Sequence, residues 1–182
     1  MANFELRAAA RRLRQGLFSC ALATGALACV TIVAPQASGG AVLAQAAAAD
    51  AVPDTRLEEL SITTSSGKHV FKVEVMRSQE QLSRGLMFRR NLAADRGMLF
   101  DFQEVKPVAM WMRNTYISLD MVFIDAQGLV VNVATNTEPL SEETITSARP
   151  VLSVLEVIAG TARRIGLKPG DLVVHKLFRN TR

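Results

Sequence analysis

A break in composition near residue 46 constrains this chain more than any other feature, because it decides which part of the sequence has to fold. Four arginines precede an uncharged, moderately apolar stretch at residues 17–33, and small residues follow up to Ala49. This order is typical of a secretory signal peptide. We therefore expect a signal peptide at residues 1–46, a flexible lead-in at 47–55 and one folded domain at 56–182.

The export route leaves alternatives open. Ala44-Gln45-Ala46 has the small-x-small pattern of a signal peptidase site, so we expect cleavage after Ala46, although cleavage after Ala44 also fits. The expected location is therefore the periplasm or the exterior. An uncleaved membrane anchor is the alternative, because the apolar stretch is at the lower edge of the length that spans a bilayer. Arg11-Arg12 leaves open a twin-arginine signal in place of a general secretory one.

Removal of the predicted signal peptide, the leader at residues 1–46, changes the net charge and the cysteine content of the chain. Four of the 21 Lys and Arg residues and one of the 17 Asp and Glu residues lie in it, so the remaining chain is close to neutral. We expect no nucleic-acid partner, because no basic face is implied. Both cysteines, Cys20 and Cys29, also belong to the leader, so we expect neither a disulfide nor a thiolate metal site in the mature protein. No cofactor and no stable membrane span are expected in the mature form.

Short apolar or alternating runs separated by turn residues dominate the sequence after residue 56. A run that includes Leu60 and Ile62, a turn at 65–68 and a strand at 69–76 predict a hairpin. The tight connection at residues 125–128 predicts that the strands on either side of it pair antiparallel. Further strands are expected at residues 97–102, 108–112, 119–125, 129–134, 153–158 and 172–178.

Two short helices complete the prediction. Ser78 and Gln81 have the spacing of a capping box, which predicts a helix that runs to about Phe88. Another helical turn or two is expected at 159–167, and the polar residues 136–150 are expected to form a long surface loop. The predicted fold is α+β and predominantly β: a single compact domain of about eight short strands that curl into a barrel or a sandwich, with two short helices.

Several segments, in order, carry a family resemblance. They are Arg84-Gly85-Leu86-Met87-x-Arg89, Gly97-Met98-Leu99-Phe100-x-Phe102, Trp111-Met112-x-Asn114-Thr115-x-Ile117-x-Leu119-Asp120-x-x-Phe123-Ile124-Asp125, Val154-Leu155-Glu156-x-x-Ala159-Gly160 and Gly170-Asp171. Over residues 70–175 the chain resembles the DUF192 (UPF0127) family. The resemblance implies an often exported, β-rich domain without an assigned function. Met110 and Ser118 replace the family's usual Phe and Pro, and the 136–150 segment lacks the cysteine pair that some relatives carry.

Common catalytic systems find little support in the sequence. His69 and His175 are the only histidines, and neither has the spacing of a zinc hydrolase motif. No nucleophile elbow, phosphate-binding loop or dinucleotide fingerprint is present. The chain has one Trp and one Tyr, too few for the stacking platforms of nucleic-acid binding proteins.

A polar cluster next to Trp111 has two interpretations. Asn114 is a turn former, and Asp120 can accept backbone hydrogen bonds or pair with Arg113, so the cluster can be purely structural. Alternatively, Trp111 is the apolar wall of a cleft and Arg113, Asn114 and Asp120 are its polar groups. This second interpretation predicts a non-enzymatic module that binds a small molecule or an envelope protein.

Glu156 is a carboxylate within an apolar run, where we expect it to be buried. A buried carboxylate is usually paired, and Arg84 is the predicted partner in a structural ion pair. An alternative hypothesis is an exported hydrolase-type enzyme that uses Asp120 and Glu156 as an acid/base pair.

Met110 and Met112 support a third hypothesis. Residues two apart on a strand share a face, and a pair of thioethers favours Cu(I). A third ligand is missing from this pattern, so core packing by adaptable methionines is the alternative.

Overall fold

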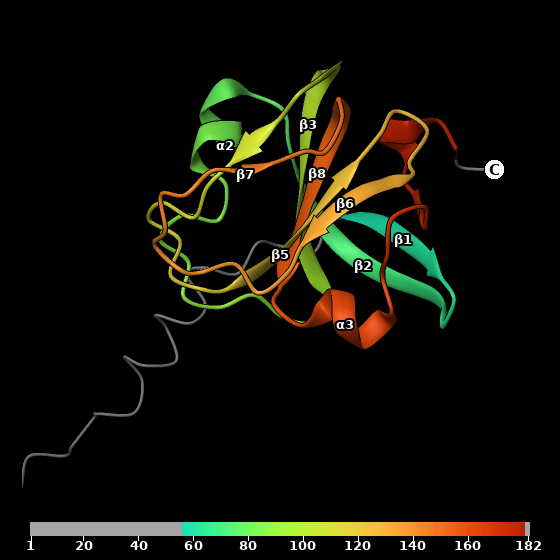
Figure 1. Ribbon diagram of the computed structural model, residues 1–182, viewed down its shortest axis with the longest axis horizontal. Coiled ribbons are helices and arrows are strands. Elements are labelled where there is room, and N and C mark those ends of the chain that lie inside the picture. Colours follow the sequence, from blue (N-terminus) through green and yellow to red (C-terminus); the bar gives the residue numbers. More distant parts are fainter. Residues whose placement is uncertain (1–55, 181–182) are drawn as a thin grey trace, which may run out of the picture. The chain divides into compact units, whose positions relative to one another are not determined.

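A computed structural model describes residues 56–180, so the predicted signal peptide and lead-in lie outside the described residues. Strands far outnumber helices here (Figure 1), as predicted for a β-rich α+β domain. No helix in this part of the chain is long and apolar enough to cross a membrane. In chain order the elements are β1 (Glu58–Thr64), β2 (Gly67–Met76), α2 (Gln79–Arg84), β3 (Arg96–Lys106), β4 (Ala109–Met110), β5 (Leu119–Ile124), β6 (Val130–Ala134), β7 (Ile145–Thr146), β8 (Val151–Ile158), α3 (Thr161–Ile165), β9 (Leu172–Val174) and the 3-10 helix η2 (Lys176–Phe178).

Seven of the described strands form one sheet in the order β6-β5-β8-β3-β2-β1-β9, and β4 pairs with β7 separately. Neighbouring strands are antiparallel except for β2 and β3, which run parallel. The sheet curls until its two ends meet, where Val130 N–H donates to the Asp171 carbonyl at 2.9 Å and Val173 N–H to the Gly128 carbonyl at 2.8 Å. The predicted curling of the sheet is therefore confirmed.

The two predicted tight connections are present. Residues 65–66 join β1 and β2 in register, with Thr64 opposite Gly67. Between β5 and β6, Asp125 Oδ1 accepts hydrogen bonds from the N–H groups of Gln127 and Leu129 at 3.0 and 2.9 Å. Such side-chain bonds to the backbone two and four residues ahead stabilise a reverse turn.

Helix α2 begins where the capping box predicts it and ends earlier than expected. Ser78 Oγ accepts from Gln81 N–H at 3.2 Å, and Gln81 Oε1 accepts from Ser78 N–H at 3.1 Å. The helix stops at Arg84 rather than near Phe88, because Gly85 adopts a φ of +47°. A side chain at Gly85 would also meet the Phe100 ring, whose Cζ would be 2.9 Å from the new Cβ.

Two predicted strands are shorter than the sequence suggests. The 108–112 run forms only β4, which pairs with β7 inside the predicted 136–150 loop. The 172–178 run forms β9 and then η2, where His175 Nδ1 accepts from Leu177 N–H at 3.2 Å. In the 172–178 run a local side-chain bond thus ends the extended backbone before its apolar pattern ends.

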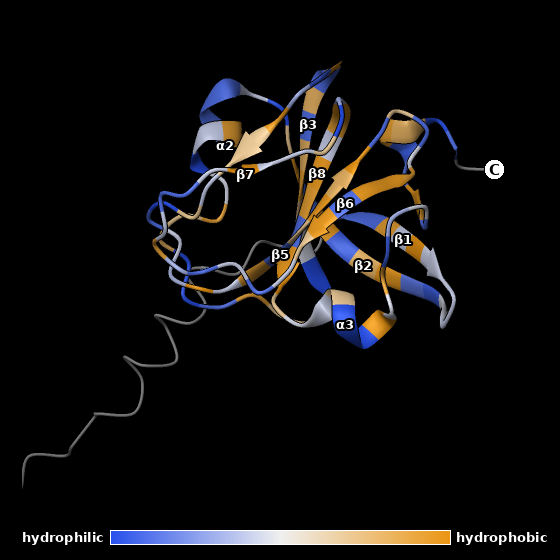
Figure 2. Ribbon diagram, viewed as in Figure 1, coloured by the Kyte–Doolittle hydropathy of each residue, from blue (hydrophilic) through white to orange (hydrophobic). Residues whose placement is uncertain are grey.

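Strands β5 and β8 and the first half of β3 are buried on both faces, and Figure 2 shows hydrophobic stretches on β8 and a largely hydrophilic α2. One core lies inside the curl and draws on all seven strands of the sheet, including Leu60, Phe71, Val122, Val130, Leu155 and Val173. The outer face of the central strands packs against the segments between β2 and β5, and this second core includes Leu86, Met98, Phe100, Val108, Met112 and Met121. The candidate site lies in this second core.

Candidate functional site

Two buried carboxyl groups, those of Asp120 and Glu156, lie on the neighbouring strands β5 and β8. Glu156 is directly opposite Met121 in the register of this pair. Directly opposite side chains share a face of the sheet, and successive residues alternate between faces. Asp120 therefore faces away from Glu156, with the sheet between them. The predicted acid/base pair of a hydrolase is wrong for this reason.

Asp120 is fully buried and has both carboxyl oxygens occupied. Oδ1 accepts from Asn136 N–H and Oδ2 from Ala162 N–H, each at 2.8 Å. Ala162 lies in the first turn of α3, whose N-cap Gly160 has no side chain to accept from it. Asp120 thus caps α3 from a neighbouring strand and fixes the segment after β6. The prediction that Asp120 belongs to a ligand cleft is wrong.

Glu156 has the opposite environment. It is 4 % exposed, and its cross-strand neighbours are Met98 and Met121, neither of which offers a hydrogen-bond donor. Burial raises the pKa of its carboxyl group to about 8. Within residues 56–180 no side chain or backbone group forms a hydrogen bond or an ion pair with this carboxyl group.

Arg84, the predicted partner of Glu156, is exposed at the end of α2. The two residues line the same small cavity, but their charged groups form no ion pair. The turn at Gly85 explains this result, because it places Leu86 rather than Arg84 in the core, with Leu86 only 2 % exposed. The predicted Arg84–Glu156 ion pair is therefore wrong.

A cavity of about 30 Å³ lies between Glu156 and the turn that follows α2. Arg84 is the only other charged residue among those that line it. A cavity of this size holds about one water-sized group. Its remaining walls are mainly apolar and include Leu82, Leu86, Met87, Phe100, Met110 and Trp111, with Thr115 and Ser83 as polar members.

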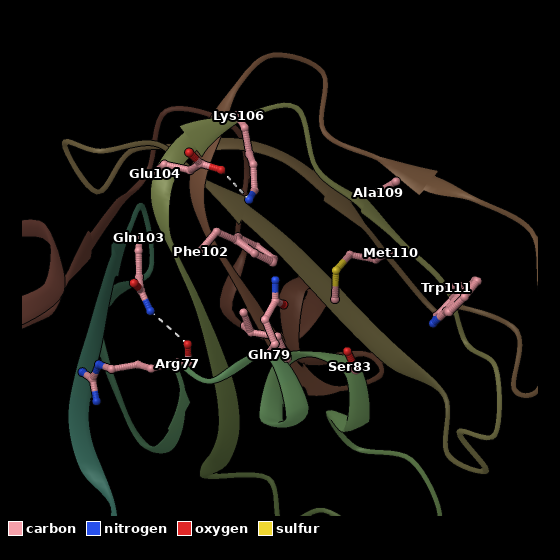
Figure 3. Close-up of a pocket in the computed structure, with 11 residues that line it drawn as sticks. Arg77, Gln79, Ser83, Phe102, Gln103, Glu104, Lys106, Ala109, Met110 and Trp111 are labelled. Atoms are coloured by element: carbon pink, nitrogen blue, oxygen red, sulfur yellow. Dashed lines mark hydrogen bonds and ion pairs between the residues drawn. The ribbon is translucent and has the colours of Figure 1, made fainter.

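A groove of about 670 Å³ adjoins this cavity and shares Leu82, Ser83, Met110 and Trp111 with it. Figure 3 shows the groove between α2, the last residues of β3 and the segment that contains β4. Two of its cations are already paired, Lys106 with Glu104 at 2.7 Å and Arg77 with Asp101 at 3.3 Å. This volume and this mixture of apolar and polar walls are common in sites for small molecules.

Of the four residues predicted to line a cleft, Trp111 alone lines the groove and the cavity. Its side chain is 51 % exposed, and the Arg113 guanidinium lies over its ring at 5.7 Å from the centroid. Arg113 is itself exposed and has Glu142 at 3.7 Å. Asn114 adopts a φ of +56°, and its carbonyl accepts from Phe88 N–H at 2.9 Å, so it serves a turn. The predicted four-residue cleft is thus wrong in composition.

Comparison with known proteins decides the family. The family model for DUF192, whose description is "Uncharacterized ACR", matches residues 61–175, well over half of the chain. The chain belongs to the DUF192 family. No curated protein matches it.

Two solved structures share this DUF192 fold. One is a Sinorhizobium meliloti 1021 protein described as a candidate transcription regulator; it is 45% identical, and the match covers 66% of this chain and 95% of that one with a TM-score of 0.65. The other is a protein of unknown function from Novosphingobium aromaticivorans DSM 12444, at 39% identity, 65% and 85% coverage and a TM-score of 0.64.

Four of the five segments on which the DUF192 resemblance rests meet around the cavity. Residues 84–87, Phe100, Trp111, Thr115 and Glu156 come from four separate segments and line one space. The sequence identifies these segments but does not show that they converge. Their convergence depends on the strand order, which places β8, with Glu156, between β5 and β3.

The methionines of this DUF192 domain are mainly core residues. Met112 is 1 % exposed, and its Sδ accepts a hydrogen bond from Thr137 Oγ1 at 3.1 Å. Met110 lines the groove and the cavity. In the described part of the chain, no group of three or more His, Cys, Asp or Glu residues is arranged to hold a metal ion.

The sequence analysis missed most of the groove. Gln79 and Ser83 lie on the exposed side of a six-residue helix, while Phe102, Gln103 and Lys106 lie at the end of β3. None of these residues has a local signature of binding. The only available signal was the length of β3, whose end extends beyond the last residue that pairs with β2, Phe100.

Proposed function

We propose that this DUF192 domain is a non-enzymatic module that binds a small ligand in the groove between α2, β3 and β4. One observation carries the proposal: the groove adjoins a cavity in which the carboxyl group of Glu156 is buried without a partner from the described residues. Burying such a group costs free energy, and sites with strongly perturbed carboxyl groups in cavities are candidates for function. Half-exposed Trp111, on the boundary of both spaces, supports the same assignment.

The opposite orientation of Asp120 argues for binding rather than hydrolysis. A general acid and a general base must both reach the substrate. Glu156 reaches the cavity, while Asp120 is fully buried and bonded to backbone on the other face. The proposal therefore assigns recognition, rather than proton transfer, to the groove.

A substitution in the groove tests the proposal. Compounds from a panel of small metabolites are screened by the fluorescence of Trp111, which is the only tryptophan in the chain. Binding is then mapped by NMR on the backbone amides of α2, β3 and β4. Ser83→Leu adds bulk to the groove on an exposed helix position, and we expect it to weaken binding by about tenfold or more, about 1.4 kcal/mol. Glu80→Leu, on the same helix but outside the groove, is the matched control.

Two results would contradict the proposal. Binding that shifts amides elsewhere and responds equally to Ser83→Leu and Glu80→Leu would move the site away from the groove. A panel that yields no binder, with a protein segment protecting the groove in its place, would favour a docking surface for an envelope protein.

We also propose that the domain is exported, on the basis of the basic, apolar and small-residue order of residues 1–46. Mass spectrometry of the protein from an envelope fraction is expected to give an N-terminus between Gln45 and Ala48. A full-length species that begins at Met1 and stays in the membrane fraction would support the anchor and contradict cleavage.

A further inference from the structure

We propose that the ligand carries a primary ammonium group on an unbranched chain, and that this group enters the cavity to pair with Glu156 while the chain lies along the groove. This inference rests on the proposed function and names the class of ligand. It starts from the buried carboxyl group, with which no cation of residues 56–180 forms an ion pair. Met98 and Met121 flank it on β3 and β5. Arg84 is the only charged residue that the other cavity walls contribute, and it forms no ion pair with Glu156.

The size of the cavity selects among cations. At about 30 Å³ it accepts a compact group of about one water in size. An ammonium group is a compact point charge with three donors, whereas a guanidinium is a larger planar fork. A compact primary ammonium therefore suits this space better than a planar guanidinium does.

The walls of the cavity and the groove suit both the ammonium group and the apolar chain that bears it. Phe100 and Trp111 offer aromatic surfaces, which attract cations. The Arg113 guanidinium already lies over the Trp111 ring, at 5.7 Å from its centroid, so this indole accepts a cation in the present structure. Leu82 and Met110 line both spaces and provide an apolar path from the groove to the cavity.

Binding of the cation has a defined proton balance. Burial raises the pKa of Glu156 to about 8, so the carboxyl group is mainly protonated at pH 7. The ammonium group keeps its proton, and Glu156 releases one proton to solvent as the pair forms. Affinity is therefore expected to rise about tenfold per pH unit below about pH 7 and about fivefold between pH 7 and pH 8. It should level off above that value and fall as the free amine forms near pH 10.4.

The experiment uses Trp111 fluorescence and calorimetry with the full-length protein. The probes are n-butylammonium, its neutral match n-butanol, and the blocked amino acids Nα-acetyl-lysine methylamide and Nα-acetyl-arginine methylamide. We expect the two primary amines to bind, with about fivefold higher affinity at pH 8 than at pH 7, because half of Glu156 is ionised at its pKa of about 8. The butanol and arginine probes should bind at least about tenfold more weakly than the amines at pH 8.

Two variants with the same Glu→Gln substitution complete the test. Glu156→Gln keeps the shape of the side chain, and it should abolish both the preference for amines and the rise with pH. Glu59→Gln removes an exposed carboxyl group on β1, outside both spaces, and should leave the affinities unchanged. Equal binding of amine and alcohol, or equal amine binding by the two variants, would overturn the ammonium assignment. If another compound then binds in a manner sensitive to Ser83→Leu, the groove stands as a site for a different ligand; if none does, the proposed function fails as well.

Discussion

Asp120 and Glu156 lie on adjacent strands, one position apart in register. Their carboxyl groups face opposite sides of the sheet and have opposite environments there. On the face of Asp120, two backbone N–H groups at 2.8 Å satisfy both oxygens. On the outer face, Glu156 has methionine neighbours, a small cavity and no hydrogen bond or ion pair from the described residues.

This difference separates a structural carboxylate from a candidate functional one. Hydrogen bonds to a buried carboxyl group offset the free-energy cost of removing it from water. Through its two bonds, Asp120 holds α3 and the segment after β6 in place. No group of residues 56–180 compensates for the burial of Glu156, and a buried carboxyl group without a partner is a candidate for a role in binding. The account therefore assigns stability to one face and recognition to the other.

The largest effect is expected from Asp120→Ala. The substitution leaves the N–H groups of Asn136 and Ala162 without their buried acceptor. We expect a loss of about 3–5 kcal/mol in the free energy of unfolding at pH 7. Urea denaturation measures this loss. A loss below about 1 kcal/mol would break the comparison, since it would mean that water replaces these bonds without cost.

A change of opposite sign is expected from Glu156→Gln. The folded protein holds a proton on Glu156 up to about pH 8, whereas the unfolded chain releases it near its ordinary pKa of 4.5. Raising the pH from 4.5 to about 8 therefore lowers the free energy of unfolding of the native protein by about 1.4 kcal/mol per pH unit. The glutamine variant does not titrate, so it should be about 3 kcal/mol more stable than the native protein at pH 7.

Urea denaturation from pH 5 to pH 8 checks this prediction. The advantage of Glu156→Gln should be below about 1 kcal/mol at pH 5 and grow steadily towards pH 8. Glu58 and His175 titrate in both proteins, so their contributions cancel in the difference. A constant difference across this range would show that Glu156 is ionised throughout and has a partner.

The smallest effect is expected from Arg84→Ala. Arg84 is exposed and forms no ion pair with Glu156, so its removal should change the free energy of unfolding by less than about 0.5 kcal/mol at pH 7. The Arg84→Ala, Glu156→Gln double variant should then show the sum of the two single effects. Urea denaturation of the four proteins provides the cycle, and a coupling above about 1 kcal/mol would restore the ion pair that the sequence predicted.

The sequence predicted the elements well because their signals are local. The capping box at Ser78 and Gln81, the β1–β2 hairpin and the turn at Asp125 each depend on residues a few positions apart. Helix α2 ended too late in the prediction, because the contact that favours glycine at position 85 comes from Phe100 on β3.

The candidate site could be predicted only in part, because it depends on pairings between distant segments. The sequence indicated correctly that Trp111 lines a cleft and that Glu156 is buried. It could not show that Asp120 and Glu156 face opposite sides, since this follows from the register of β5 and β8. The pairing of Arg84 with Glu156 was wrong for a similar reason: a turn with a positive φ at Gly85, rather than the helix, sets the direction of the chain there.

The most direct test of the account is the pKa of Glu156 itself. Carbon-13 NMR of the protein with labelled glutamate, compared with the Glu156→Gln variant for assignment, follows the carboxyl signal from pH 4 to pH 9. The account predicts a midpoint at about 8, raised by burial, and a downward shift of that midpoint when n-butylammonium is added. A midpoint near the ordinary value of 4.5, unchanged by the amine, would show that Glu156 is already paired or solvated and would contradict the assignment of recognition to this face.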